Sequence, residues 1–191
     1  RDGGPPMPEA SRKEELEGYQ RCFQEFMRKG ITSIGDASVD PGKIRVYQEL
    51  VEAGMPLRIN MMIREKYFSD LKKLNIHTKF GNSRLKIGPI KVRHGNSLSG
   101  RTCWLYEPYE RINPRTGKKD YYGIPPARSQ EKLTELFSDI HAVGFQIAVH
   151  SNGDREIDMV LNAIEKALQK TPREDHRHRI EHCSIVSARI L

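Results

Sequence analysis

The sequence predicts an α/β protein built around a parallel sheet of about five strands with flanking helices. Apolar, β-branched runs alternate along the chain with segments whose apolar residues recur at helical spacing. Strands separated by helices form right-handed crossovers, which make neighbouring strands parallel. With 191 residues, the chain is shorter than the ~250 residues of a closed eight-stranded barrel. The pattern therefore leaves two alternatives, an open doubly wound sheet or a segment of a barrel.

Five segments have the composition of buried strands. They are residues 31–37, 57–63, 85–92, 145–150 and 179–186. Pro89 is a flaw in the third of them, because proline cannot donate to a sheet ladder. No GxGxxG or GxxxxGK[ST] motif follows any of these strands, which argues against a dinucleotide or P-loop site.

Helix-start signals precede the helical segments. Ser11 and Glu14 form a capping box, and Asp40 followed by Pro41 suits an N-cap and a first helical position. Asp154 is the expected cap of the helix that follows the fourth strand. A short, weak helix is expected at residues 68–74.

A long, turn-rich stretch, residues 95–127, joins the third strand to the next helix. A connection of this length in a compact domain is usually a functional or a disordered loop. Its aromatic residues favour the functional alternative. Arg101, Tyr106 and Tyr109 are candidates either to contact substrate or to pack the loop onto the body of the protein.

The composition is typical of a soluble protein from a reducing compartment. Hydrophobic residues make up 37% and charged residues 30% of the chain, and the mean hydropathy is −0.66. The three cysteines are far apart and form no CxxC, which argues against a disulfide framework. No apolar run approaches the ~20 residues of a membrane span, and no signal peptide is visible. We therefore expect a cytoplasmic protein without membrane contact.

The net charge of +7 raises the alternative of nucleic-acid binding. The basic residues are spread along the chain, whereas a nucleic-acid binder needs a contiguous Lys/Arg face. We therefore expect no nucleic-acid partner.

Three of the predicted strands carry a candidate metal ligand near the carboxyl end: Lys91, His150 and His182. In parallel α/β sheets, ligands bind at this end of the strands, and imidazole is an ordinary zinc ligand. An ammonium has no lone pair, but a lysine that burial has made neutral can react with carbon dioxide. The resulting carbamate can bridge two metal ions about 3.5–4 Å apart. Taken singly, such a histidine is more often an ordinary polar residue, and such a lysine more often reaches solvent.

Several local segments resemble those of the amidohydrolase superfamily, in the branch of N-substituted formamide deformylase and the YtcJ-like hydrolases. In chain order they are GITSIGDA at 30–37 (GVTTVHDA in the family), KVRHGNSLSGRT at 91–102 with EPY at 107–109 (K…DGSLGSRT…EPY), HSNGDREID at 150–158 (HxxGDxAxD) and RHRIEH at 177–182 (RHRIEH). The last two, about thirty residues apart, form a specific pair. Together the segments cover most of the chain.

The resemblance implies that residues 1–191 are the central part of a metal-dependent (β/α)8 hydrolase barrel of the TIM type, with residues 95–127 as a loop over its mouth. It implies one or two divalent metal ions, with zinc expected, and hydrolysis of a C–N, amide-type bond in a small-molecule substrate by metal-activated water. Carried over by position, Lys91 would be a carboxylated bridging ligand, and His150 and His182 would be ligands from the next two strands.

The sequence departs from the family pattern in ways that limit this expectation. The HxH of the family's first strand is absent, since His176-Arg177-His178 precedes the wrong strand. The late-strand Asp that serves as ligand and base is also absent, so the catalytic residue is unknown and the isolated chain is expected to be inactive. Gly95 stands where the family often has Asp.

Two more departures follow Lys91, because Arg93 and His94 replace apolar or small residues. Together with Gly95 they put a standard conformation of the loop in doubt, and with it the usual choice of substrate. Glu181 precedes His182 on one strand, so we expect it to face the opposite way and to be a buried partner of a nearby arginine or backbone amide, not a metal ligand. An open barrel would also expose edge strands, which favours self-association into a homo-oligomer. The competing hypothesis is a non-catalytic α/β scaffold or binding domain that keeps the fold without the full site.

Overall fold

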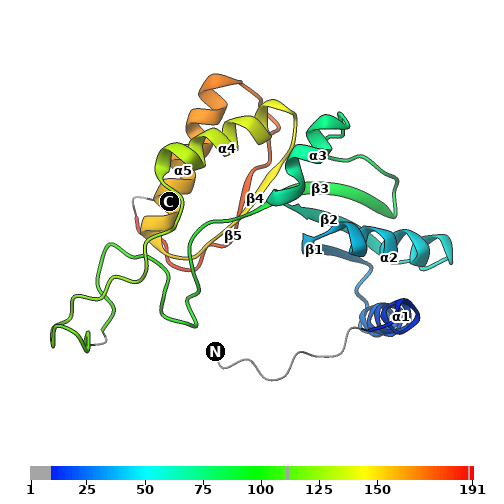
Figure 1. The fold of residues 1–191 in the computed structure, drawn as a ribbon, viewed down its shortest axis with the longest axis horizontal. Coiled ribbons are helices and arrows are strands. Elements are labelled where there is room, and N and C mark those ends of the chain that lie inside the picture. The colour runs from blue at the N-terminus through cyan, green and yellow to red at the C-terminus, as the bar shows by residue number, and fades with distance from the viewer. Residues whose placement is uncertain (1–9, 111, 189) are drawn as a thin grey trace.

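A single parallel sheet organises the part of the chain that the structure, a computed structural model, describes: residues 10–110, 112–188 and 190–191. Its strands are β1 (Ser33–Val39), β2 (Arg58–Arg64), β3 (Leu85–Arg93), β4 (Ile147–Ser151) and β5 (Arg179–His182). They lie side by side in chain order (Figure 1). Because the order never reverses, right-handed crossovers place all connecting helices on one face, as in a barrel. The sheet is therefore a curled half-barrel of the TIM type, and the doubly wound alternative is wrong.

The helices follow the predicted order. They are α1 (Arg12–Arg28), α2 (Pro41–Glu52), the 3-10 turn η1 (Glu65–Tyr67), α3 (Phe68–Lys73), α4 (Gln130–Ala142) and α5 (Asp154–Lys170). The capping box of Ser11 and the N-cap of Asp40 are confirmed. The cap predicted at Asp154 is wrong, because Gly153 is the N-cap of α5. The Asp154 carboxylate instead accepts the backbone N–H of Tyr106 from the long loop, at 3.0 Å.

The hydrophobic core lies between the sheet and the helices. Its fully buried members include Ile90 and Val92 of β3, Ile147 and Val149 of β4, Leu133, Phe137 and Ile140 of α4, and Val160 and Ala163 of α5. Successive side chains of a strand point to opposite faces. The intervening residues of β3 and β4 therefore point away from the helices, toward the concave side where a barrel binds its ligands.

A β-bulge interrupts the pairing of β2 with β3. Met61 pairs with Ile87 and Ile63 pairs with Ile90, so β3 holds one extra residue in this interval. Pro89 lies in the bulge, where its missing N–H removes no ladder hydrogen bond. The flaw noted in the sequence is thus accommodated inside the strand.

The last strand is shorter than the predicted residues 179–186. Its end coincides with two successive residues in the left-handed region, His182 at φ 72° and Cys183 at φ 48°. The Cys183 N–H still donates to the Ser151 carbonyl at 3.1 Å, so the chain stays against β4 after it leaves the strand.

The long loop between β3 and α4 contains no helix or strand among its described residues. It extends beyond the carboxyl ends of the strands (Figure 1). No helix in the described ranges is long and apolar enough to cross a membrane.

Candidate functional site

A cavity of about 550 Å³ opens at the carboxyl ends of the strands. Its lining consists of Ala37, Ser38, Arg64, Glu65, Lys66, Lys91, Arg93, His150, Glu181 and His182. All three residues predicted as metal ligands are in this wall, although they come from three different strands. The structure thus brings the three side chains to one place.

The strand register explains why these side chains share a face. Arg93 pairs with His150, and His150 pairs with Glu181, so the three form one row across β3, β4 and β5. Lys91 lies two residues before Arg93 and therefore on the same face. The row places a lysine, an arginine, a histidine and a glutamate along the concave wall.

His182 joins this row by a different route. Strict alternation would turn it away from Glu181, yet both line the cavity, so the expectation of opposite faces is wrong. The left-handed backbone at His182 ends the regular strand and redirects its side chain. Its ring lies edge-on to the ring of His150, with the centroids 4.7 Å apart.

A backbone carbonyl fixes the tautomer of His150. Its Nε2 lies 2.8 Å from the carbonyl oxygen of Asn96, which only accepts, so Nε2 carries the proton. The Nδ1 atom then keeps its lone pair. Burial lowers the pKa of His150, opposed by the Asn96 hydrogen bond, and the nearby His182 lowers it further. The imidazole is therefore neutral near pH 7, as a metal ligand must be.

Lys91 is half-buried, and burial lowers its pKa. Glu181 opposes this shift, while Arg179 and Arg93 reinforce it. A lower pKa increases the share of neutral amine, which is the form that reacts with carbon dioxide. The environment of Lys91 therefore favours the chemistry that would turn it into an anionic ligand.

Glu181 is engaged by an arginine, as the sequence predicted. The guanidinium of Arg179 donates to both of its carboxylate oxygens, one of them at 2.9 Å. The Arg179 hydrogen bond is the main reason that the pKa of Glu181 is lowered. Glu181 is thus a neutralised part of the wall.

The donor set fits part of a metal centre. Two imidazoles face one cavity, beside a lysine that can become a carbamate. Among the residues that the structure describes, however, no three His, Cys, Asp or Glu side chains come together in a way that could hold an ion. Further anionic or imidazole ligands would have to complete the site.

The HxH of this chain lies elsewhere, as expected from its position. His178 Nδ1 accepts the N–H of Ile147 at the amino end of β4, at 3.0 Å, and its Nε2 lies 2.9 Å from His141 Nδ1. Burial is the first cause that lowers the pKa of His178, to about 3. His141 and His178 therefore help to pack the region at the amino end of β4.

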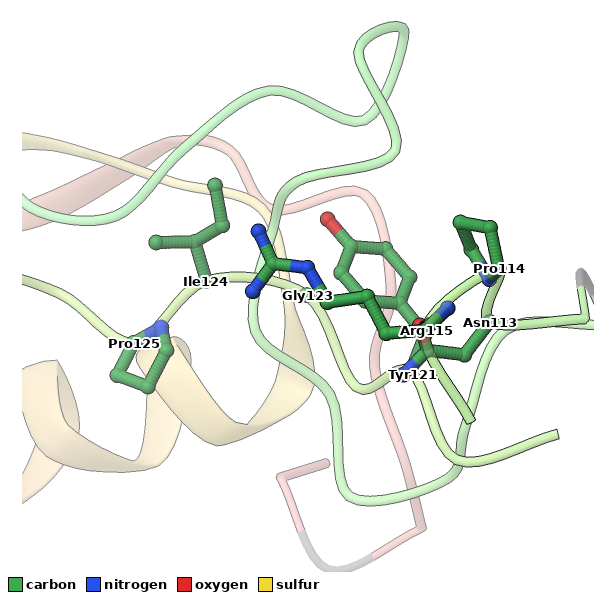
Figure 2. A pocket seen from close by; sticks show the side chains of 7 residues that line it. All are labelled: Asn113, Pro114, Arg115, Tyr121, Gly123, Ile124 and Pro125. Atoms are coloured by element: carbon green, nitrogen blue, oxygen red, sulfur yellow. Dashed lines mark hydrogen bonds between the residues drawn. The ribbon is translucent and has the colours of Figure 1, made fainter. Parts of the chain in front are cut away.

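A second cavity, of about 490 Å³, lies within the long loop. Its lining is Asn113, Pro114, Arg115, Tyr121, Gly123, Ile124 and Pro125. Figure 2 shows the Arg115 side chain extending from the Tyr121 side of this cavity toward Ile124. None of the predicted site residues lines it. The strand-end cavity is therefore the better candidate for chemistry.

Aromatic residues of the loop anchor it. The hydroxyl of Tyr106 donates to Asp158 of α5 at 2.6 Å, and the hydroxyl of Tyr109 donates to the Cys103 carbonyl at 3.0 Å. The contact of Tyr106 with α5 supports packing of the loop onto the body of the protein, whereas the hydrogen bond of Tyr109 lies within the loop itself.

Sequence reasoning missed Glu156. It lies in the third position of α5, is fully buried, and accepts four backbone N–H groups. The related segment HxxGDxAxD has alanine at this position, and that difference was the available signal. The local pattern favoured Asp154 instead, as the cap of this helix.

The fold and the cavity together define a partial (β/α)-barrel with a candidate ligand site at the carboxyl ends of its strands. Residues 4–190 match the amidohydrolase family. The chain therefore belongs to the amidohydrolase family.

Known relatives agree with this assignment. The chain is 26% identical to the putative amidohydrolase YtcJ of Bacillus subtilis over 97% of its own length and 34% of the relative. It is 25% identical to the protein LONG AFTER FAR-RED 3 of Arabidopsis thaliana, over 93% of its length and 31% of the relative. It thus spans about a third of the length of these curated relatives.

Two solved structures share the fold. An uncharacterised metal-dependent hydrolase from Pyrococcus furiosus matches with a TM-score of 0.76 and 26% identity, over 96% of this chain and 36% of that one. Another, from Pyrococcus horikoshii OT3, matches with a TM-score of 0.74 and 22% identity, over 94% and 34%. The five parallel strands thus correspond to part of a complete hydrolase barrel.

Proposed function

We propose that this chain supplies part of the metal site of an enzyme that hydrolyses C–N, amide-type bonds in small molecules. The observation that carries the proposal is the cavity wall shared by Lys91, His150 and His182. Membership of the amidohydrolase family, and the likeness to metal-dependent hydrolases, support it.

The three side chains have complementary roles in this proposal. His150 and His182 offer imidazole nitrogens. The ammonium of Lys91 first loses one proton; the neutral amine then adds carbon dioxide, forming an N–C bond and releasing a second proton, so that a cation becomes an anionic carbamate. The divalent ion, with zinc expected and one or two ions per site, would polarise the scissile carbonyl and lower the pKa of a water molecule. The proton acceptor in the reaction stays unassigned.

Loss of either histidine tests the metal site. In the full-length protein, His150→Ala and His182→Ala are each expected to lower metal affinity by more than the roughly 10–100-fold that follows loss of an outer-sphere partner. The measurement is metal content after dialysis, by elemental analysis, together with hydrolysis of a panel of N-acyl compounds. His176→Ala is the matched control, because His176 lies away from the cavity, beside His178.

If the full-length protein binds no divalent metal and tolerates both substitutions, the proposal is wrong. The protein would then be the non-catalytic α/β domain of the competing hypothesis.

The charge of the cavity wall supports a substrate class. Its two carboxylates are already paired, Glu65 with Arg128 at 3.0 Å and Glu181 with Arg179. Arg64 and Arg93 line the same wall and form no ion pair with any described residue. The unpaired guanidinium groups favour a substrate that carries a carboxylate.

Arg93→Met is expected to lower kcat/KM for an N-acyl amino acid by about tenfold or more, the value of one charge-assisted hydrogen bond. The same variant should leave kcat/KM for the matching neutral N-acyl amine nearly unchanged. Arg115→Met, in the loop cavity of Figure 2, is the control. The strand-end wall does not select the substrate if Arg93→Met lowers kcat/KM equally for both substrates. The same conclusion follows if only Arg115→Met removes the preference for the N-acyl amino acid.

A further inference from the structure

The carboxylate of Glu156 joins two separate parts of the chain. Its Oε1 accepts the backbone N–H groups of Asn96, at 3.2 Å, and Trp104, at 2.7 Å, both from the long loop. Its Oε2 accepts those of Asn152 and Gly153, each at 3.2 Å, from the turn between β4 and α5. Four donors thus converge on one side chain that is 0% exposed.

This buried charge is balanced by N–H groups rather than by a cation. Among the described residues, no lysine, arginine or histidine forms an ion pair with Glu156. Charge-assisted hydrogen bonds from backbone N–H groups, together with the positive end of the α5 dipole, compensate for its desolvation. Removing the carboxylate would leave several buried donors without an acceptor.

Gly95 lies against the same carboxylate. Its backbone has φ +92°, and a Cβ at this position would lie 2.2 Å from both Cδ and Oε2 of Glu156. The related segments have the reverse arrangement, with aspartate at position 95 and alanine at position 156. In this chain the carboxylate of Glu156 therefore fills the space into which a side chain at position 95 would extend.

The peptide of Asn96 connects this carboxylate with His150. Its N–H donates to Glu156, and its carbonyl accepts from Nε2 of His150, at 2.8 Å, and from Nδ2 of Asn152, at 2.9 Å. The orientation of that one peptide determines which nitrogen of His150 holds the proton. Glu156 thus reaches the imidazole through a single backbone unit.

We propose that Glu156 is a positioning residue for His150, and that its carboxylate takes the place of the aspartate that the family segment DGSLGSRT has at position 95. The role of His150 as a ligand rests on the proposed function. The relocation of the carboxylate does not.

A set of double substitutions tests the relocation. In the full-length protein, Gly95→Asp with Glu156→Ala places a carboxylate in the same space, now attached at position 95. Gly95→Ala with Glu156→Ala adds the same Cβ without a carboxylate. Aspartate tolerates positive φ better than most residues. The aspartate variant is expected to have a folding equilibrium constant at least about tenfold above that of the alanine variant, in urea unfolding. Equal constants, or a more stable alanine variant, would overturn the relocation.

Nitrogen-15 NMR of selectively labelled histidines in the metal-free protein tests the positioning. The Nε2-protonated tautomer of His150 is expected in the native protein and a mixture of tautomers in Glu156→Gln, which keeps the shape but turns an amide toward two N–H donors. Asp154→Asn is the control, because Asp154 has no contact with Asn96 among its hydrogen bonds. If Glu156→Gln loses stability but leaves the His150 signals unchanged, Glu156 is only a structural anchor and the positioning role is refuted. Neither experiment depends on metal or on hydrolysis.

Discussion

Lys91→Ala is expected to lower kcat/KM of the full-length protein by about a thousandfold or more, because it removes the half-buried lysine of the cavity wall whose lowered pKa favours carbamate formation. Such a loss corresponds to about 4 kcal/mol of transition-state stabilisation. Added acetate or propionate should restore part of the activity, since a free carboxylate can enter the space left by the side chain. Carbon-13 NMR after incubation with labelled bicarbonate should show a carbamate signal in the native protein and none in the variant.

Lys86→Ala is the matched control for Lys91→Ala. It removes an exposed lysine from the same strand, outside the cavity. Full activity and metal content in Lys91→Ala, or an equal loss in Lys86→Ala, would contradict the role of Lys91. Loss of activity without rescue, in a native protein that gives no carbamate signal, would point to a neutral amine as the active form.

The second large effect concerns acid stability and His94. This imidazole is 1% exposed, and neither ring nitrogen has a hydrogen-bond partner among the described residues. Burial, with a further contribution from Arg128, lowers the pKa of His94 to about 4 from 6.5. The native state therefore resists protonation at pH values where the unfolded chain accepts a proton.

The direction of the pH effect follows from that difference. Above pH 6.5 the imidazole is neutral in both states and contributes no pH dependence. Between pH 6.5 and about 4 only the unfolded state gains the proton, so stability falls with falling pH, by about 3 kcal/mol in total. His94→Phe should remove this contribution, visible as a shallower decline of the urea unfolding free energy between pH 7 and 4.

His77→Gln provides the comparison for His94→Phe, because His77 is exposed. Its pH profile of stability should follow that of the native protein. A His94→Phe profile parallel to the native one would show that another group dominates acid unfolding.

The sequence predicted the main elements because their signals are local. The capping box at Ser11 and the Asp40 cap depend on residues within one helical turn, and both are present. The candidate site could be found because parallel strands bring their carboxyl ends together, so Lys91, His150 and His182 were expected at one edge. The choice between barrel segment and doubly wound sheet needed the spatial order of strands, which periodicity does not contain.

Two features of the site could not be read from local signals. The end of β5 depends on left-handed backbone at two successive residues, His182 and Cys183. Histidine is enriched in that region, but positive φ is uncommon for any residue other than glycine, so the sequence alone does not signal it. The role of Glu156 depends on donors about fifty and sixty residues away, at Trp104 and Asn96. Only the folded chain brings these N–H groups to that carboxylate.

The extra residue in β3 determines which side chains at the end of this strand face the cavity and which face the helices. Regular alternation from buried Ile87 would place Lys91 in the hydrophobic core beneath the helices and Val92 in the cavity wall. The insertion near Pro89 shifts this count by one, so that Ile90 and Val92 face the helices and Lys91 faces the cavity. A single irregular step in the backbone thus determines which side chains of the end of β3 face the cavity. A one-residue deletion there would turn Lys91 toward the helices and place an aliphatic side chain in the cavity wall instead.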